Sequence, residues 1–426
     1  MAKPLFYGWI LLGALWLVFA FNLGFPAYGG PVLNTAMATE LGFSRETLGL
    51  ITTFYIIMSG LPGPLVAMAV SRFGVRRTLI AGSLLNVTGA LIMATVARSG
   101  AMAYLAFGLI IGGGVCSGAA IASQTALSRW FLRRRALALS ILYSSGAIGG
   151  YFAVKHVLPW AMREGGSWRA GWWVIVALSA IAGVLALTVV RERPEDMGLL
   201  PDGDPAAGTA GAVVRTRPAF ITTTAWESHE VLRRPTYWLI VFSLVGGSGG
   251  YTLFLAHGIV HLQDLGHSID TARGALATMT WTGLLAKAVI MLLGDRVDPR
   301  YLWSAFMVFF GAGLVIIVEA RTPLLVNAFA TCLGIGFGGG VVCLMTVLGN
   351  YYGLKVFALL SGIAIAINTT LSALAPYIAG FMFDLGYGYG GTCFFLAAWC
   401  FVGALVLFLI RKPIHPTVPV TAPATA

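Results

Sequence analysis

Long apolar runs, separated by short polar breaks, follow one another along the whole chain of 426 residues. A helix that crosses a bilayer needs about 20 mostly apolar residues, and the runs reach this length. They are apolar on all sides, whereas the strands of a membrane barrel alternate in polarity over segments of about ten residues. The sequence therefore predicts an all-α membrane protein.

We predict twelve transmembrane helices, near residues 7–35, 47–70, 78–97, 102–128, 137–160, 170–190, 237–261, 272–294, 302–318, 323–347, 357–382 and 391–410. The composition agrees, because 58% of the residues are hydrophobic and only 10% are charged. A water-soluble protein of that composition would expose too much apolar surface. The first run has no small-residue cleavage site, so we interpret it as a retained helix and not as a signal peptide.

The net charge of +11 would suggest nucleic-acid binding in a soluble protein, but most of the 27 basic residues lie at the ends of predicted helices. If both termini face the cytoplasm, most of these basic residues lie on the cytoplasmic side, which is the distribution that the positive-inside rule describes. We therefore expect a multi-pass protein of the inner (plasma) membrane with cytoplasmic termini and no nucleic-acid partner. The five cysteines lie in apolar segments without metal-ligand spacing, so we expect no metal, cofactor or disulfide.

One long polar break, rich in Gly, Pro and Asp, divides the chain. It contains "RERPEDMGLLPDGDPAAGTAGAVV", whose composition is typical of a linker. We predict an N-terminal six-helix bundle at 1–191, a cytoplasmic linker at 192–235, a C-terminal six-helix bundle at 236–411 and a disordered cytoplasmic tail at 412–426.

Internal repeats support the division into two halves. "SRFGVRR" from residue 71 matches "DRVDPR" from residue 295, and "GGGVC" from residue 112 recurs as "GGGVVC" from residue 338. These repeats occur in the same order and at similar offsets, which indicates duplicated halves. Many secondary transporters have this organisation, with a substrate site between the halves near the middle of the bilayer.

The stretch "AMAVSRFGVRR" resembles the loop between helices 2 and 3 of the major facilitator superfamily. "FAFNLGFP", "RWFLRRRALALS", "SWRAGWW" and "GFMFDLGYGYGGTCFF" resemble its monocarboxylate transporter branch and the bacterial oxalate/formate antiporters. The resemblance implies two pseudo-symmetric bundles. It also implies gating contacts at the cytoplasmic helix ends by Arg72, Arg76, Arg77, Asp295 and Arg296. The acid that the family has in the first copy is replaced here by Ser71, and Asp295 keeps it in the second.

Lys287 is a lone cation within the apolar stretch "TWTGLLAKAVIMLLGDR". A charge in mid-helix costs roughly 2.5 to 3.5 kcal/mol on insertion scales and usually has a partner. All 16 acidic residues fall in predicted loops or at helix ends, so we infer that the partner is the carboxylate of a substrate. One alternative is that Lys287 extends to the interface, a climb of about 11 Å; a neutral, desolvated amine is another.

The resemblance also shows where the chain departs from its relatives. Animal monocarboxylate transporters have a helix-1 Lys just after Phe-Pro and a helix-8 Asp four residues before an Arg. The corresponding residues here are Ala27, Gly283 and Lys287. The resemblance therefore implies that Lys287 binds a carboxylate, but it does not imply the proton relay of the family, because the residues of that relay are missing.

Thr280, Gly283 and Lys287 share one face of their helix, where Gly283 would leave room for substrate. His257 and His261 lie one turn apart and are the candidates for carrying a proton, with His257 also expected near the substrate; the alternative is a pair of polar residues at an outer helix end. Similar transporters place a histidine at the position of His257. The other candidates for substrate binding are Tyr28, Asn22, Ser117, Gln124 and Asn368.

We expect a monomeric secondary active transporter of small organic anions, in particular monocarboxylates such as lactate or pyruvate, working by proton-coupled alternating access. A carboxylate exchanger of the oxalate–formate type is an alternative. A drug/proton antiporter of the same superfamily is another, although it would normally need an acid in its cavity. No motif of a metalloprotease and no nucleophile with a buried base is present, so we do not expect an enzyme.

Overall fold

The computed structural model describes residues 6–43, 45–203, 220–222 and 224–415. The predicted tail at 412–426 and the middle of the predicted linker thus lie largely outside the described residues. The described part contains twelve helical segments that are long and apolar enough to span a membrane, which confirms the predicted number. These segments are Tyr7–Leu41, Gly49–Phe73, Val75–Thr95, Gly100–Trp130, Arg135–Gly165, Trp168–Thr188, Pro235–Leu255, Gly274–Leu293, Pro299–Val318, Pro323–Tyr352, Leu354–Met382 and Gly390–Leu409.

The first six segments form the N-terminal half, in which several membrane spans consist of successive α-helical and π-helical pieces. Its elements are α1 (Tyr7–Phe19), η1 (Ala20–Gly29), α2 (Gly30–Leu41), α3 (Arg45–Met58), α4 (Gly63–Phe73), α5 (Val75–Thr95), α6 (Gly100–Ala103), η2 (Tyr104–Ile111), α7 (Gly112–Val115), η3 (Cys116–Ala120), α8 (Ile121–Trp130), α9 (Arg135–Phe152), η4 (Ala153–Val157), α10 (Leu158–Gly165) and α11 (Trp168–Thr188).

The last six segments form the C-terminal half. Its elements are α13 (Pro235–Asp264), α14 (Ile269–Leu293), α15 (Pro299–Val318), α16 (Pro323–Tyr352), α17 (Phe357–Ser372), α18 (Leu374–Met382), η7 (Phe383–Tyr387) and α19 (Gly390–Leu409). The short elements η5 (Pro194–Met197), η6 (Pro201–Gly203) and α12 (Ser228–Leu232) lie in the described parts of the connection between the halves.

The starts of several helices follow from local sequence. Asp298 and Thr322 each precede a proline that opens α15 or α16, and their side chains accept the N–H groups of Arg300 at 3.2 Å and Leu325 at 3.3 Å. A short polar side chain at the N-cap satisfies a free N–H group, and proline loses no hydrogen bond in the first turn. The boundaries of α15 and α16 are therefore set by the residues next to each proline.

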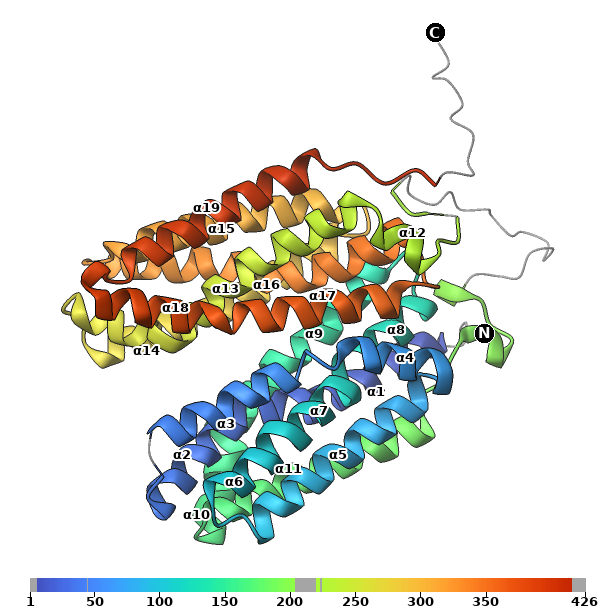
Figure 1. The fold of residues 1–426 in the computed structure, drawn as a ribbon. Helices are drawn as coiled ribbons and strands as arrows, with labels where there is room; N and C mark the ends of the chain where they lie inside the picture. Colours follow the sequence, from blue (N-terminus) through green and yellow to red (C-terminus); the bar gives the residue numbers. More distant parts are fainter. Residues whose placement is uncertain (1–5, 44, 204–219, 223, 416–426) are drawn as a thin grey trace, which may run out of the picture.

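The two halves are close together at one end of the molecule and diverge toward the other (Figure 1). The close end carries the described parts of the connection between the halves, and we call it the linker end. The contacts between the halves are made mainly by α4 with α17 and by α9 with α14 and α16. The halves therefore meet at the linker end and are farther apart at the opposite end, which we call the outer end.

Glycine allows the backbones of α4 and α17 to touch. A Cβ atom on Gly362 would lie 2.8 Å from the carbonyl carbon of Gly63, and one on Gly63 would lie 3.2 Å from Cα of Gly362. Small residues at a helix crossing permit this approach in membrane proteins. The two glycines therefore form a close-packed crossing between the halves.

Candidate transport site between the two halves

Lys287 lies on the side of α14 that faces the protein. Trp281, Leu285 and Leu292 form an exposed apolar stripe on this helix, with 64%, 62% and 65% of their surface accessible. Each residue turns a helix by about 100°, so Lys287 lies about 200° around the helix from Leu285. Its side chain is half-buried. This placement argues against a lysine that extends along the lipid to the interface.

Lys287 makes no hydrogen bond or ion pair with any described residue. The helix above it is packed tightly, because Gly283 lies against α16: a Cβ on Gly283 would be 3.3 Å from the carbonyl oxygen of Gly334 and 3.7 Å from Cα of Gly338. Gly283 thus serves helix packing in this arrangement, and the space expected beside it is taken by α16. Thr280 is exposed and donates to Leu276 O of its own helix at 2.9 Å.

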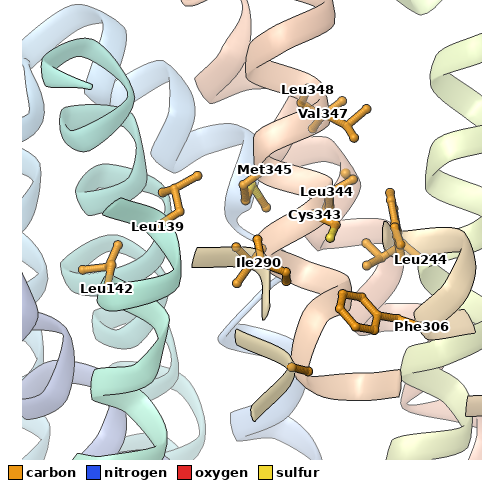
Figure 2. Close-up of a cluster of buried hydrophobic side chains, with 14 of the residues drawn as sticks. Leu139, Leu142, Leu244, Ile290, Phe306, Cys343, Leu344, Met345, Val347 and Leu348 are labelled. Carbon is orange, nitrogen blue, oxygen red and sulfur yellow. The ribbon is translucent and has the colours of Figure 1, made fainter. Parts of the chain in front are cut away.

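An apolar layer closes the protein on the linker side of Lys287. Ile290, one turn along α14, is fully buried, as are Leu139 and Leu142 of α9 and Met345 of α16. Figure 2 shows Leu139 of α9 pointing toward Met345 of the other half, with Ile290 beside Met345. Lys287 therefore lies just beyond a dry contact between the halves, on its outer side.

Asp295 connects the two halves at the linker end. Its Oδ1 accepts the N–H group of Ala136 at 2.7 Å and its Oδ2 that of Leu137 at 3.1 Å. These N–H groups belong to the first turn of α9, which has no partner for them in its own helix, and Arg134 before it provides no side-chain cap. Asp295 of the C-terminal half thus caps a helix of the N-terminal half. Burial raises the pKa of Asp295 from 3.8 to about 6, although the two N–H groups and Arg135 act in the opposite direction.

Arg135 and Asn350 form a second connection between the halves. The buried guanidinium of Arg135 donates from Nη1 to Oδ1 of Asn350 at 2.9 Å. The main-chain carbonyl of Asn350 also accepts the N–H group of Thr222 at 2.6 Å. Asn350 therefore joins α9, α16 and the C-terminal part of the connecting segment.

The other predicted gating residues have no described contact with the opposite half. Arg76 hydrogen-bonds to the carbonyl of Leu187 within the N-terminal half. Arg72 stacks on a neighbour of its own helix, and Arg77 and Arg296 are exposed. Among these five residues, the described link between the halves is made by Asp295.

Ser71, the counterpart of Asp295 in the first copy of the repeat, donates to the Met68 carbonyl of its own helix at 2.8 Å. The helix α17, which α4 contacts, has no side-chain cap at its first residue. Only one of the two equivalent positions therefore carries a capping carboxylate, and the linker end is closed asymmetrically.

Asn22 and Gln124 lie inside the N-terminal half. Asn22 is fully buried and donates to Ser83 Oγ at 2.8 Å and to Gly118 O at 2.9 Å, while Gln124 accepts from Tyr143 at 2.7 Å. These bonds join membrane helices of one half to each other. Ser117 is half-buried and donates to Gly113 O of its own span at 2.8 Å.

Tyr28 is partly exposed, and Asn368 has a side-chain oxygen without a described hydrogen-bond partner. Tyr28, in the π-helical segment η1, has 43% of its surface exposed. Asn368 of α17 is half-buried, and its Oδ1 has no hydrogen-bond partner in the described part of the chain. π-helical turns often mark functional sites.

His257 and His261 lie inside the C-terminal half. The Nε2 atom of His257 lies 3.0 Å from Pro376 O, and that of His261 lies 3.0 Å from Ile317 O. A carbonyl only accepts hydrogen bonds, so each Nε2 carries a hydrogen. The Nδ1 atom of His257 lies 3.2 Å from the hydroxyl of Tyr389. The histidines thus connect α13 to its neighbours in the same half.

Sequence reasoning missed several residues of this region. The sequence does not pair Arg135 with Asn350, and it does not indicate Tyr55 and Tyr251, which interact with Tyr28. The run of basic residues before α9 was a signal for Arg135, because a buried arginine needs a partner. For the tyrosines, no local pattern distinguishes a residue at the interface of the halves from one that faces lipid.

In the described part of the chain, twelve helices that could span a membrane form two halves that meet at one end, which defines a multi-pass membrane protein with the architecture of many transporters. The family comparison agrees: the model described as Major Facilitator Superfamily matches residues 11–278 and 258–425. The chain belongs to this superfamily, whose members are transporters and not enzymes.

The relatives are distant but cover most of the chain. The uncharacterized transporter YycB of Bacillus subtilis (strain 168) is 24% identical over 386 residues, which is 88% of this chain and 87% of YycB. Human monocarboxylate transporter 6 is 22% identical over 425 residues, 95% of this chain and 81% of its own. The probable nitrate/nitrite transporter NarK2 of Mycobacterium tuberculosis (strain ATCC 25618 / H37Rv) is 25% identical over 338 residues, 78% of this chain and 77% of its own.

Among solved structures, a variant of the Escherichia coli fucose:proton symporter FucP superposes with a TM-score of 0.70 at 12% sequence identity. The superposition covers 94% of this chain and 97% of FucP. This likeness shows the fold, with its two six-helix bundles.

Proposed function

We propose that this protein transports small organic anions, in particular monocarboxylates such as lactate or pyruvate, by proton-coupled alternating access of its two halves. The observation that carries the proposal is Lys287. Its side chain faces the protein and makes no ion pair or hydrogen bond with any described residue. An unpaired cation in a membrane helix is unfavourable unless an anion or water compensates it, and a substrate carboxylate would do so in each transport cycle.

The relatives support an anion as the substrate. The names of two of them, monocarboxylate transporter 6 and the probable nitrate/nitrite transporter NarK2, refer to anions. The monocarboxylate resemblance extends over 95% of this chain. A carboxylate is the anion that fits both the resemblance and a single lysine, which provides a point charge and not the forked donor of an arginine.

The charges at the linker end support an inner membrane orientation with cytoplasmic termini. The described residues at this end include Arg72, Arg77, Arg133 and Arg296, in agreement with the positive-inside rule. Closure at the cytoplasmic end would leave the Lys287 site in contact with the outside. This is the arrangement in which an importer receives its substrate.

Proton coupling supplies a driving force for the anion. An anion that enters alone moves against an inside-negative potential of about 2.3 kcal/mol per charge per 100 mV, and a proton carried with it removes this cost. His257 and His261 are the proposed carriers, because an imidazole ring can take up and release a proton at its ring nitrogens. Carboxylate exchange also balances charge, and the transport test below separates the two.

The test is uptake of labelled lactate and pyruvate into proteoliposomes that contain the full chain, the Lys287→Gln variant or the Lys155→Gln variant. Lys155 is a matched control, since it also lies in a membrane helix, but its amine is 5.5 Å from the ring centre of Tyr151. We expect Lys287→Gln to lose uptake and Lys155→Gln to retain it. Carboxylate uptake that is unchanged in Lys287→Gln would refute the assignment.

An inward proton gradient and internal unlabelled substrate are applied in separate experiments. A symporter is stimulated by the gradient without internal substrate. An exchanger needs internal substrate and does not respond to the gradient alone.

A further inference from the structure

Two tyrosines connect the halves beyond the level of the linker end. Tyr28 of η1 and Tyr251 of α13 share a side-chain hydrogen bond. The ring of Tyr28 lies over Gly150 of α9, where a Cβ atom would be 2.6 Å from Cγ of the ring. Any residue larger than glycine at position 150 would displace the ring. The position of Tyr28 is therefore fixed by its own half, while its hydroxyl meets the other half.

A third phenol lies near this pair. Tyr55 of α3 interacts electrostatically with Tyr28, and its ring stacks on Phe107 with centroids 4.5 Å apart and planes at 10°. The side chain is only 6% exposed, yet its hydroxyl has no hydrogen-bond partner in the described part of the chain. A buried hydroxyl without a partner is unfavourable, which indicates that a further group forms a hydrogen bond with it.

The phenols lie close to the level of Lys287. The ring of Tyr251 stacks on Phe337 of α16, with centroids 3.6 Å apart and planes at 2°. The next residue, Gly338, packs against Gly283 of α14. Lys287 follows Gly283 by one turn toward the linker end, which is about 6 Å along the helix. Tyr251 therefore lies near the level of Gly283, and the side chain of Lys287 leans toward this level because helical side chains tilt toward the N-terminal end of their helix.

The hydrogen-bonding capacity of the three phenols is incomplete. In a bond between two phenols one hydroxyl donates, so the other still has its hydrogen to give. The hydroxyl of Tyr55 is also a donor without a described acceptor. Two donors are thus available on the side toward which the side chain of Lys287 leans. An ammonium group and two hydroxyl donors that face one another can together hold a carboxylate and a second oxygen on the neighbouring carbon.

We infer that Tyr28, Tyr55 and Tyr251 form a hydroxyl subsite that binds the 2-hydroxy or 2-oxo oxygen of a short monocarboxylate, whose carboxylate lies on Lys287. The inference rests on the proposed function and adds to it a preference for monocarboxylates that have an oxygen at carbon 2. Tyr28 and Tyr55 belong to the N-terminal half, whereas Tyr251 and Lys287 belong to the C-terminal half. A ligand bound among them contacts both halves and therefore affects how the two halves pack against each other.

The subsite is tested by binding to the purified full-length protein, with affinity measured from ligand-dependent thermal stabilisation. Lactate and propionate are the probes, because they have the same carbon chain and differ in the oxygen at carbon 2. We expect the parent protein to bind lactate at least about tenfold more tightly than propionate, since one hydrogen bond is worth about 1 kcal/mol and an unpaired buried donor adds to the difference.

Tyr251→Phe and Tyr55→Phe should weaken lactate binding toward that of propionate and leave propionate binding within about twofold, because phenylalanine removes only the hydroxyl. Retained propionate binding also shows that each variant is folded. Tyr377→Phe is the matched control, as Tyr377 is 73% exposed on α18, and it should behave as the parent.

The outcomes separate the two claims. A parent protein that does not distinguish lactate from propionate, or a Tyr251→Phe variant that keeps the full preference, overturns the subsite while carboxylate binding through Lys287 stands. Absence of carboxylate binding in the parent, or equal binding in Lys287→Gln, overturns the proposed function and the subsite together.

Discussion

The carboxylate of Asp295, just beyond the end of α14, accepts the N–H group of Ala136 at the start of α9 at 2.7 Å. One half of the protein thus caps a helix of the other. The bond exists only while the linker end is closed, because the two residues belong to different halves. Any condition that changes the charge of Asp295 therefore changes the balance between the closed and open linker end.

We predict that acidification favours the closed linker end. Burial raises the pKa of Asp295 in the closed arrangement from 3.8 to about 6, and an open linker end would hydrate the group and return the pKa toward 3.8. The closed form then binds the proton more tightly, so it gains stability as the pH falls from about 6 to 3.8 and loses this gain as the pH rises through about 6. Electron paramagnetic resonance distances between spin labels at Arg77→Cys and Val297→Cys measure the closure.

Asp295→Asn provides the control for this pH dependence. Asparagine keeps an acceptor for the N–H groups of α9 and cannot ionise, so the variant should remain closed across the same pH range. Closure that increases with rising pH in the parent protein, or a titration that persists in Asp295→Asn, would contradict the prediction.

A bulky residue in the contact between α4 and α17 should hold the linker end open. In Gly362→Leu the new side chain would overlap the backbone of Gly63, since even a Cβ atom would be 2.8 Å from its carbonyl carbon. We expect longer distances between labels at the linker end and reduced binding of outside ligands.

Gly13→Leu is the matched control for this substitution, because nothing lies within 4 Å of a Cβ atom there. It should leave closure unchanged. A Gly362→Leu protein that folds and closes like the parent would show that this crossing does not limit the approach of the halves.

Two substitutions of Asn350 should shift the population with a closed linker end in opposite directions. Asn350→Ala removes the acceptor of Arg135 Nη1, which now bonds to Oδ1 at 2.9 Å, and should lower the closed-to-open ratio by about tenfold or more, because a hydrogen bond to a charged group is worth about 1.5 to 3 kcal/mol. Asn350→Asp supplies a charged acceptor and should raise the ratio. The same spin-label distances measure both, and equal shifts in one direction would disprove the pairing.

His257→Gln should separate proton coupling from substrate binding. His257 bonds to Pro376 O and to the Tyr389 hydroxyl, so protonation of its ring would change the contact between helices of the C-terminal half. We expect loss of uptake driven by a proton gradient, with lactate binding and exchange at equal concentrations retained. His267→Gln is the control, because His267 bonds to Ala320 O at 2.6 Å near the outer end. Gradient-driven uptake in His257→Gln would exclude this histidine as the carrier.

Local sequence was sufficient to predict the membrane spans. Hydrophobicity adds up along each run, and every buried backbone group in lipid must be satisfied within its own helix. The span at Pro323–Tyr352 nevertheless extends beyond the predicted end at 347. Its last turns bury Tyr351 and Tyr352 against protein, so tertiary packing, and not apolar length, sets this boundary.

For the candidate site, the sequence could identify Lys287 but not its surroundings. An unpaired cation is visible because the acids can be counted along the chain. That Gly283 packs on α16 and that Asn22 bonds to Ser83 depends on how each helix is rotated and where it crosses its neighbours. Those rotations follow from side chains far apart in the sequence.

The sequence by itself determined the twelve spans, the duplicated halves and the lone lysine, since each is a property of one segment or of a repeat. Only the tertiary structure decided that Asp295 caps α9, that the exposed stripe at Trp281 and Leu285 leaves Lys287 facing the protein, and that Tyr28 meets Tyr251. The physical reason is that these relationships depend on how helices pack within and between the two halves. Their residues come together only when both bundles have folded and approached each other.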